Sequence, residues 1–139
     1  MTGAAPAPFL VARYLSPEWF EDVNRVARES SELTAATRDV RLLLQQVVTG
    51  GPDGDVPYWV RVEAGHVEAG LGEVADPDVT VTQSYETAVA VSTGALRAQT
   101  AVMEGRVRLA GNTAVLREHQ DALVGVGTVF DSVRSRTGY

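Results

Sequence analysis

Apolar and polar residues alternate at five places along the chain, which is the pattern of half-buried β-strands. The alternation predicts strands at residues 40–49, 56–63, 67–71, 79–82 and 106–109. The first of these is apolar on both faces, through Leu43 and Val47 on the second face, which predicts cover on both sides. The small and polar residues at 50–55 and at 64–65 predict turns, so the first three strands should follow one another as hairpins.

Helical spacing of apolar residues appears first after Ser16, which is a good N-cap and is followed by a proline suited to the first helical turn. The apolar positions that recur on one face of this helix are Trp19, Phe20, Val23, Val26 and Ala27. We interpret its two aromatic residues as core anchors rather than as a cofactor stack. Residues 28–39 are small and polar, and they predict a connection or a frayed helix end.

Three more helical segments follow the fourth strand. Ser84 can cap a helix that ends at Gly94, and a second short helix containing Leu96 and Met103 ends at Gly105. Residues 113–124 are amphipathic and predict a last helix, which Gly125 and the glycine at 127 interrupt before a second helical piece. The predicted order is therefore α-β-β-β-β-α-α-β-α. This order indicates an α+β domain with a five-stranded, mostly antiparallel sheet covered by helices.

Composition removes several classes of function. The net charge is −6, which argues against a nucleic-acid partner, and the absence of cysteine excludes disulfides and thiolate chemistry. All 12 basic residues are arginine, which we take as the codon bias of a GC-rich bacterial genome. We find no signal peptide and no membrane-spanning segment, and we expect a cytoplasmic protein. Residues 1–8 are predicted to be a disordered lead-in and residues 9–139 one domain.

The search for catalytic residues gives none. The two histidines, His66 and His119, lack the spacing of a zinc site, so no metal and no cofactor are expected. The aspartates at 53 and 55 lack the rest of a calcium loop, and we interpret them as turn residues. Arginines gather in the last third of the chain at positions 97, 106, 108 and 117. Acidic neighbours favour a solvated surface there, and a transient contact with an anionic membrane stays the alternative.

One stretch, residues 78–112, resembles the sterol carrier protein 2 family. The residues that carry the resemblance are Asp78-Val79-Thr80-Val81, Gly94, Ala101-Val102-Met103, Gly105, Val107, Leu109, Gly111-Asn112 and Leu116. The segment Tyr14–Phe20 is also similar to the opening of single-domain bacterial members. The resemblance implies that the two helices and the following strand wall off an apolar tunnel, and it implies lipid binding rather than a reaction.

The expected function is therefore binding or transfer of a long-chain apolar ligand: a fatty acid, an acyl-CoA or a sterol-like lipid. The small residues of the segment 85–103 are typical of helices that leave space beneath them, although they also suit close helix packing. The candidate lining, chosen from apolar spacing, is Phe20, Val23, Leu44, Val81, Val91, Leu96, Met103, Leu109, Leu116 and Leu123.

Two alternatives stay open at this stage. The first is a structural or dimerisation module of the same fold with a collapsed pocket, and the sequence leaves a homodimer open. The second is a small cone-shaped α+β enzyme acting on a polyketide-like or steroid-like substrate. That enzyme would need a buried pair of His119 and a carboxylate.

Overall fold

The computed structural model describes residues 12–139, and the predicted lead-in at residues 1–8 lies outside the described residues. The helices are α1 (Pro17–Glu29), α2 (Ser31–Ala36), α3 (Tyr85–Ser92), α4 (Ala98–Met103), α5 (Ala114–Glu118) and α6 (Gln120–Ser132), followed by a 3-10 helix (Arg134–Arg136). The strands are β1 (Ala12–Arg13), β2 (Arg41–Gly51), β3 (Gly54–Glu63), β4 (His66–Leu71), β5 (Val79–Ser84), β6 (Val107–Gly111) and β7 (Thr137–Gly138). None of the helices in residues 12–139 combines the length and the apolar character needed to span a membrane.

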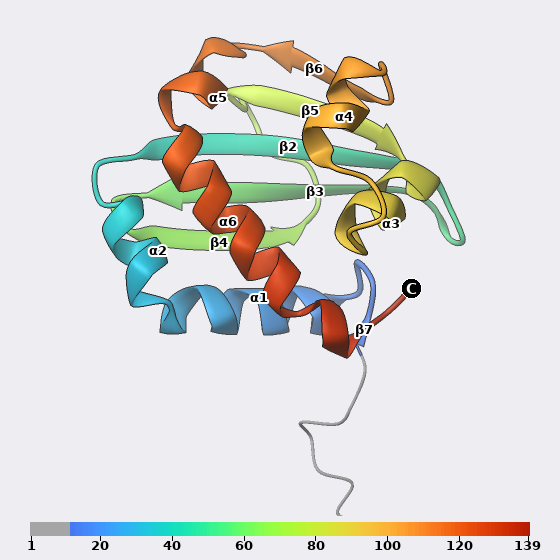
Figure 1. Ribbon diagram of the computed structural model, residues 1–139, viewed down its shortest axis with the longest axis horizontal. Coiled ribbons are helices and arrows are strands. Elements are labelled where there is room, and N and C mark those ends of the chain that lie inside the picture. Colours follow the sequence, from blue (N-terminus) through green and yellow to red (C-terminus); the bar gives the residue numbers. More distant parts are fainter. Residues whose placement is uncertain (1–11) are drawn as a thin grey trace, which may run out of the picture.

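Five strands form one sheet in the order β4-β3-β2-β5-β6 (Figure 1). Neighbouring strands are antiparallel except for β2 and β5, which run parallel and are separated in sequence by β3 and β4. The predicted α+β fold and its mostly antiparallel five-stranded sheet are confirmed. A separate parallel pair, β1 with β7, joins the two ends of the described chain.

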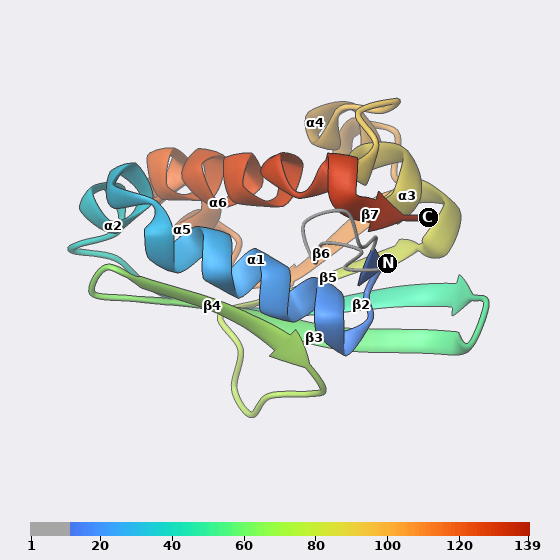
Figure 2. The same ribbon diagram turned by 90° about the horizontal axis from the view of Figure 1, so that it is seen from below.

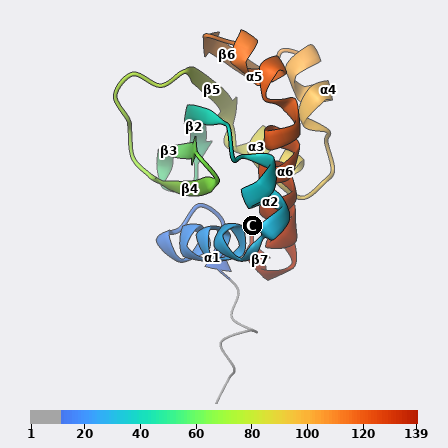
Figure 3. The same cartoon turned by 90° about the vertical axis from the view of Figure 1, so that its left-hand side faces the viewer.

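The helices gather on one side of the sheet, and we call the sheet face on that side the inner face (Figures 2 and 3). The strand register places Leu44, Val60 and Val79 side by side there, and all three are buried. The prediction that β2 is covered on both faces is only partly met. Leu43 and Val47, on its outer face, are half-buried and have no helix above them.

Helix α1 closes the β4 edge of the sheet. Ser16 caps it by accepting a hydrogen bond from the Trp19 backbone, as its sequence predicts. The apolar face of α1 is buried, and its Asn24 side chain both donates to and accepts from the Ala69 backbone of β4, at 2.8 Å each. Asn24 thus satisfies edge groups of β4 that would otherwise stay open to another strand.

The sequence did not predict α2, which forms inside the stretch expected to be a connection. Ser30 caps this helix by accepting a hydrogen bond from the Leu33 backbone, at 3.1 Å. Leu33 is its one buried residue and is 3% exposed. A six-residue helix with one N-cap and one buried apolar residue shows no helical periodicity of apolar positions. The hydrophobic pattern of the sequence therefore did not predict it.

The break in the last helical segment also differs from its prediction. The glycines at 125 and 127 were expected to interrupt the segment, but α6 runs through both, and the break falls at His119 between α5 and α6. A Cβ placed on Gly125 would lie 3.0 Å from Leu33 Cδ1. Gly125 is therefore a close-packing position between α6 and α2, and not a helix end.

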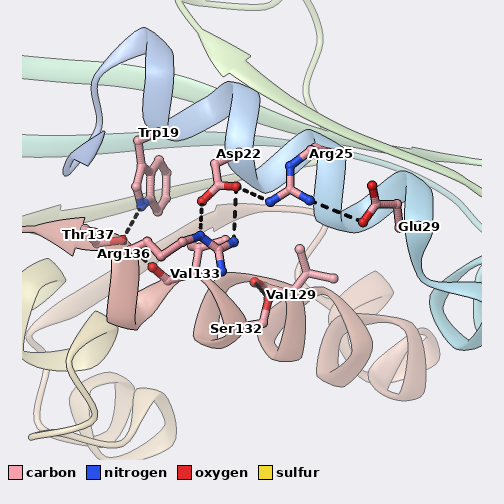
Figure 4. Close-up of polar contacts among 9 residues, drawn as sticks. All are labelled: Trp19, Asp22, Arg25, Glu29, Val129, Ser132, Val133, Arg136 and Thr137. Carbon is pink, nitrogen blue, oxygen red and sulfur yellow. Dashed lines mark hydrogen bonds and ion pairs between the residues drawn. The ribbon is translucent and has the colours of Figure 1, made fainter. Parts of the chain in front are cut away.

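The chain after α6 is bonded to α1 by a polar cluster, shown in Figure 4, that we call the C-terminal clamp. The Trp19 indole N–H donates to the Thr137 hydroxyl at 3.0 Å, and the Arg136 guanidinium donates twice to the Asp22 carboxylate, at 3.0 and 3.1 Å. Burial raises the pKa of Asp22, but hydrogen bonds from Arg136 and Arg25 outweigh that effect and lower it overall. The carboxylate therefore stays ionised, and the clamp stays formed, at neutral pH.

We expect the Asp22→Asn substitution to lower the free energy of unfolding by about 1 kcal/mol at pH 7, because it removes the charge from a partly exposed pair. A carboxyl whose folded pKa is lowered stabilises the fold above its unfolded pKa, about 3.9, and this contribution is lost as the pH falls through the folded value. The difference between wild type and variant should therefore shrink toward about pH 2. Urea unfolding at pH 7 and at acidic pH measures this difference in unfolding free energy.

The control for this prediction is Glu63→Gln at the exposed Arg41–Glu63 pair. An effect of Asp22→Asn no larger than that of the control would contradict the prediction.

The two α6 glycines give a matched pair of substitutions. An alanine in a helix interior is favoured over glycine by about 0.5–1 kcal/mol. Gly127→Ala meets nothing within 4 Å and should raise the melting temperature, whereas Gly125→Ala must displace Leu33 and should gain less or destabilise. Thermal unfolding followed by circular dichroism checks the order, and equal gains at both positions would contradict the close packing of α6 on α2.

Candidate ligand-binding site

The ten side chains that the sequence predicted as a ligand lining fall into three groups. Phe20, Val23 and Leu44 are buried in the closed core, and each is 4–5% exposed. Met103 is 87% exposed and lies on the surface. The remaining six are half-buried, and we call them the half-buried set: Val81, Val91, Leu96, Leu109, Leu116 and Leu123.

The half-buried set belongs to the second half of the chain, in β5, α3, the α3–α4 connection, β6, α5 and α6. In Figure 1 the strands β5 and β6 form the upper edge of the sheet, above the part that α1 closes. The register puts Val81 beside Leu109 on the inner face, one step from Val79, which is fully buried. Burial along the inner face therefore falls off toward β6, where apolar side chains are incompletely covered.

Helix α6 lies over the inner face of the sheet (Figures 1 and 2), and it is itself supported by other helices. Helix α6 packs against both α1 and α2, and its Ala122, Val126 and Val129 side chains are buried in the core. Within the set, Val81, Leu116 and Leu123 pack against the edge of the buried core. The side chains of the inner face are therefore covered less completely at the β6 end, where Val107 and Leu109 are half-buried.

Helix α3 is fixed at both of its ends. Ser84 accepts a hydrogen bond from the Thr87 backbone at 3.1 Å, and Gly94 ends the helix with φ +84°, as the sequence predicts. The Arg134 Nε donates to the Ser92 carbonyl oxygen at 2.7 Å, so the segment after α6 also holds the last turn of α3. The C-terminal end of α6 is thus tied through Arg134 to α3 and through the C-terminal clamp to α1.

Helix α4 is the most exposed part of this region. Of its six residues only Ala101 is buried, while Val102 and Met103 are 40% and 87% exposed. Arg97 precedes the helix, and Arg106 follows it and lies 3.7 Å from the Glu104 carboxylate. The α4 surface therefore combines exposed apolar side chains with flanking arginines.

Sequence reasoning missed one residue of the inner face, Gln83. It follows Val79 and Val81 in the alternation of β5 and pairs in register with Val48 and Val107, so it shares their face. Its Oε1 atom is buried and has no hydrogen-bond partner within residues 12–139. The signal was present in the sequence, but the strand was predicted to end at residue 82, one position too early to include it.

Three cavities open at the rim of the domain. One of about 200 Å³ lies between Tyr14, Tyr85 and the β2–β3 turn, and one of about 280 Å³ lies near Arg41 and Arg61. The third, of about 360 Å³, surrounds His119. None of these three is lined by a member of the half-buried set, and two are smaller than the roughly 300–1,000 Å³ that is usual for ligand pockets.

The surroundings of His119 weaken the enzyme alternative. His119 joins α5 to α6 and is half-buried, and across residues 12–139 no ion pair joins it to a carboxylate. Its cavity includes the side chains of Glu118 and Asp121, both exposed. In the same described range, no three residues of the types His, Cys, Asp and Glu are grouped so as to hold a metal ion.

Solved structures share this architecture. A crystal structure of sterol carrier protein 2 matches with a TM-score of 0.71 at 22% identity, over 86% of this chain and 98% of its own. A Thermus thermophilus protein, described as possibly a sterol carrier protein, matches with a TM-score of 0.72 at 21% identity, over 93% and 96%. Part of the sec-alkylsulfatase Pisa1 from a Pseudomonas species matches with a TM-score of 0.51 at 20% identity, over 70% of this chain and 14% of the enzyme. At these identities the likeness shows the fold.

The family follows from the sequence itself. No curated protein matches the chain in sequence. The sequence pattern of the SCP-2 sterol transfer family, however, matches residues 22–124, which is well over half of the chain. The match runs from the middle of α1 into α6 and therefore includes the whole sheet and every element of the half-buried set. The chain belongs to the SCP-2 sterol transfer family.

Proposed function

We propose that this chain binds a long-chain apolar molecule (a fatty acid, an acyl-CoA or a sterol-like lipid) and carries it without chemical change. The observation that carries the proposal is the half-buried apolar pair Val81 and Leu109 on the inner face near β6, together with Leu116 and Leu123, which are half-buried on the helices α5 and α6. Family membership supports lipid binding or transfer in general. The domain is mainly a lipid-binding module, although the alkylsulfatase match shows that the fold also occurs within a longer enzyme.

The ligand would lie between the β5–β6 part of the inner face and the helices α3, α5 and α6. Burial of apolar surface stabilises a complex by roughly 25 cal/mol per Å². An acyl chain placed there would cover its own surface and that of the half-buried side chains at the same time. The hydrophobic effect therefore supplies the driving force, and no charged partner for the chain of the lipid is needed.

Entry of a ligand requires the cover to open, and the two ends of α6 are held very differently. At its C-terminal end Arg134 and Arg136 bond to α3 and to α1. At its N-terminal end neither α5 nor α6 has a side-chain cap, and α5 is only five residues long. We infer that α5, which has no buried residue, moves away from β6, while α6 stays in place because it packs on α2 at Gly125 and is bonded beyond its C-terminal end.

We also propose that the exposed residues of α4 make a transient contact with an anionic membrane. The protein would collect its lipid there. Met103 and Val102 present apolar surface between Arg97 and Arg106. Arginines near an anionic lipid surface each favour binding by about 1 kcal/mol, and the attraction falls with salt. Because the whole chain has a net charge of −6, the contact would depend on this local arrangement.

The first prediction from this proposal concerns two neighbours on α6. Leu123 is half-buried, whereas Val124 is 65% exposed. We expect Leu123→Gln to weaken the binding of a fluorescent fatty acid about tenfold, since it removes apolar contact with the ligand, and Val124→Gln to leave it unchanged. Fluorescence titration of the three purified proteins measures the dissociation constants.

A companion measurement separates the carrier from the interaction module. Protein purified without detergent is denatured and extracted for mass spectrometry. An empty extract, together with no binding of the fluorescent fatty acid, would reject the carrier proposal. A dimer found by light scattering would then favour the interaction module.

The membrane contact predicts weaker vesicle binding when a negative charge is introduced on α4. We expect Met103→Glu to reduce co-sedimentation with phosphatidylglycerol vesicles about fivefold, because it places an anion where the lipid surface is negative. Val124→Glu, which adds the same charge on α6, is the control. Equal sedimentation of wild type with phosphatidylcholine vesicles, or an equal loss in both variants, would contradict a specific contact through α4.

A further inference from the structure

Two glutamine side chains of the sheet carry buried polar atoms, and they differ in how those atoms are satisfied. Gln45, on β2, donates through Nε2 to the carbonyl oxygens of Tyr58 and Gly72, at 3.0 and 3.1 Å. Its Oε1 accepts a hydrogen bond from the Val74 backbone at 2.7 Å. This amide has an evident structural role, because it fixes the segment that follows β4.

The second amide, that of Gln83, has no comparable role. Its Oε1 is buried and has no hydrogen-bond partner within residues 12–139. A buried carbonyl oxygen without a partner destabilises a fold, since it loses its bonds to water and gains none in return. An apolar side chain at this position would continue the pattern of Val79 and Val81. The fold itself therefore gives no reason for an amide at position 83.

The position of Gln83 relative to the half-buried set supplies a reason. Val81 precedes it by two residues on the same face of β5, and Val107 pairs with it on β6. Val81 is a member of the half-buried set, and Val107 is likewise half-buried. The unpartnered oxygen thus lies on the same stretch of the inner face as the apolar side chains that cover the proposed ligand.

We propose that the Gln83 carbonyl oxygen accepts a hydrogen bond from a hydroxyl group of the bound ligand, so that Gln83 selects hydroxyl-bearing lipids. This inference rests on the proposed function above and adds the chemistry of the ligand's polar group. A carbonyl oxygen has lone pairs and no proton, so its partner must be a donor. An alcohol supplies that donor, whereas an ether of the same length cannot.

The test compares two ligands that differ only in this donor, 1-dodecanol and dodecyl methyl ether. Each is titrated against protein loaded with diphenylhexatriene, an uncharged fluorescent hydrocarbon, and displacement gives its affinity. We expect wild type to bind the alcohol about fivefold more tightly than the ether, because one neutral hydrogen bond is gained. Gln83→Met, a substitution of similar length without the acceptor, should remove this preference.

Two controls make the result specific. Gln120→Met replaces an exposed amide at the start of α6 and should keep the preference for the alcohol. Gln83→Leu repeats the test with a second apolar side chain. Without ligand, both Gln83 variants should melt about 2–5 °C higher than wild type, because an unsatisfied buried acceptor is removed.

The possible failures point to different causes. Equal affinities for alcohol and ether in wild type, or a preference that survives in Gln83→Met, would overturn the role of Gln83 while leaving lipid binding intact. A lower melting temperature in both Gln83 variants would show that the amide has a structural partner, such as an internal water, and would also overturn it. Binding of neither diphenylhexatriene nor the two ligands would instead reject the proposed function.

Discussion

The bonding of the chain after α6 to α1 and α3 is the interaction on which the arrangement of the helical cover depends. Arg136 reaches back to Asp22 on the first helix, and Arg134 reaches the Ser92 carbonyl at the end of α3. These contacts are polar and directional, so they fix the position of α6 without filling the layer beneath it. Apolar packing adds to these bonds, since Ala122, Val126 and Val129 of α6 are buried in the core. Helix α6 is therefore held both by the bonds that follow its last turn and by its buried side.

The unequal burial along the sheet follows from this arrangement. At the β4 edge, α1 packs directly on the sheet, and its Asn24 side chain even bonds to the strand backbone. At the β6 edge the cover consists of short helices with few caps, and the inner-face side chains stay half-buried. One sheet thus has a rigid half and a loosely covered half.

The strands could be predicted from the sequence because strand alternation is a local pattern, and the turns at 50–55 and 64–65 predicted the pairing of the first three. The parallel pairing of β2 with β5 follows from no turn and was not predicted. The pattern failed where one or two tertiary contacts decide the structure. Helix α2 depends on its Ser30 cap and on Leu33, and Gly125 lies inside α6 at the point where α2 approaches it. Met103 was assigned to the lining because a six-residue helix does not reveal which of its sides meets the core. Gln83 was missed because the strand was predicted to end at residue 82, just after its last apolar residue, whereas the register shows that the alternation continues to Gln83. Which of the ten predicted residues contact a ligand stays a prediction.

The parallel pairing of β1 with β7 places the two ends of the described chain side by side, and α1 bonds to residues 136 and 137. During synthesis the first helix emerges from the ribosome long before these residues exist. Its Trp19 and Asp22 have no partners until residues 136 and 137 have been translated. The strands can pair earlier, but the cover over them can be secured only after residues 134–138 have left the exit tunnel. Any lipid that enters before that moment would meet an open sheet, so loading during synthesis and loading of the finished domain are physically different events.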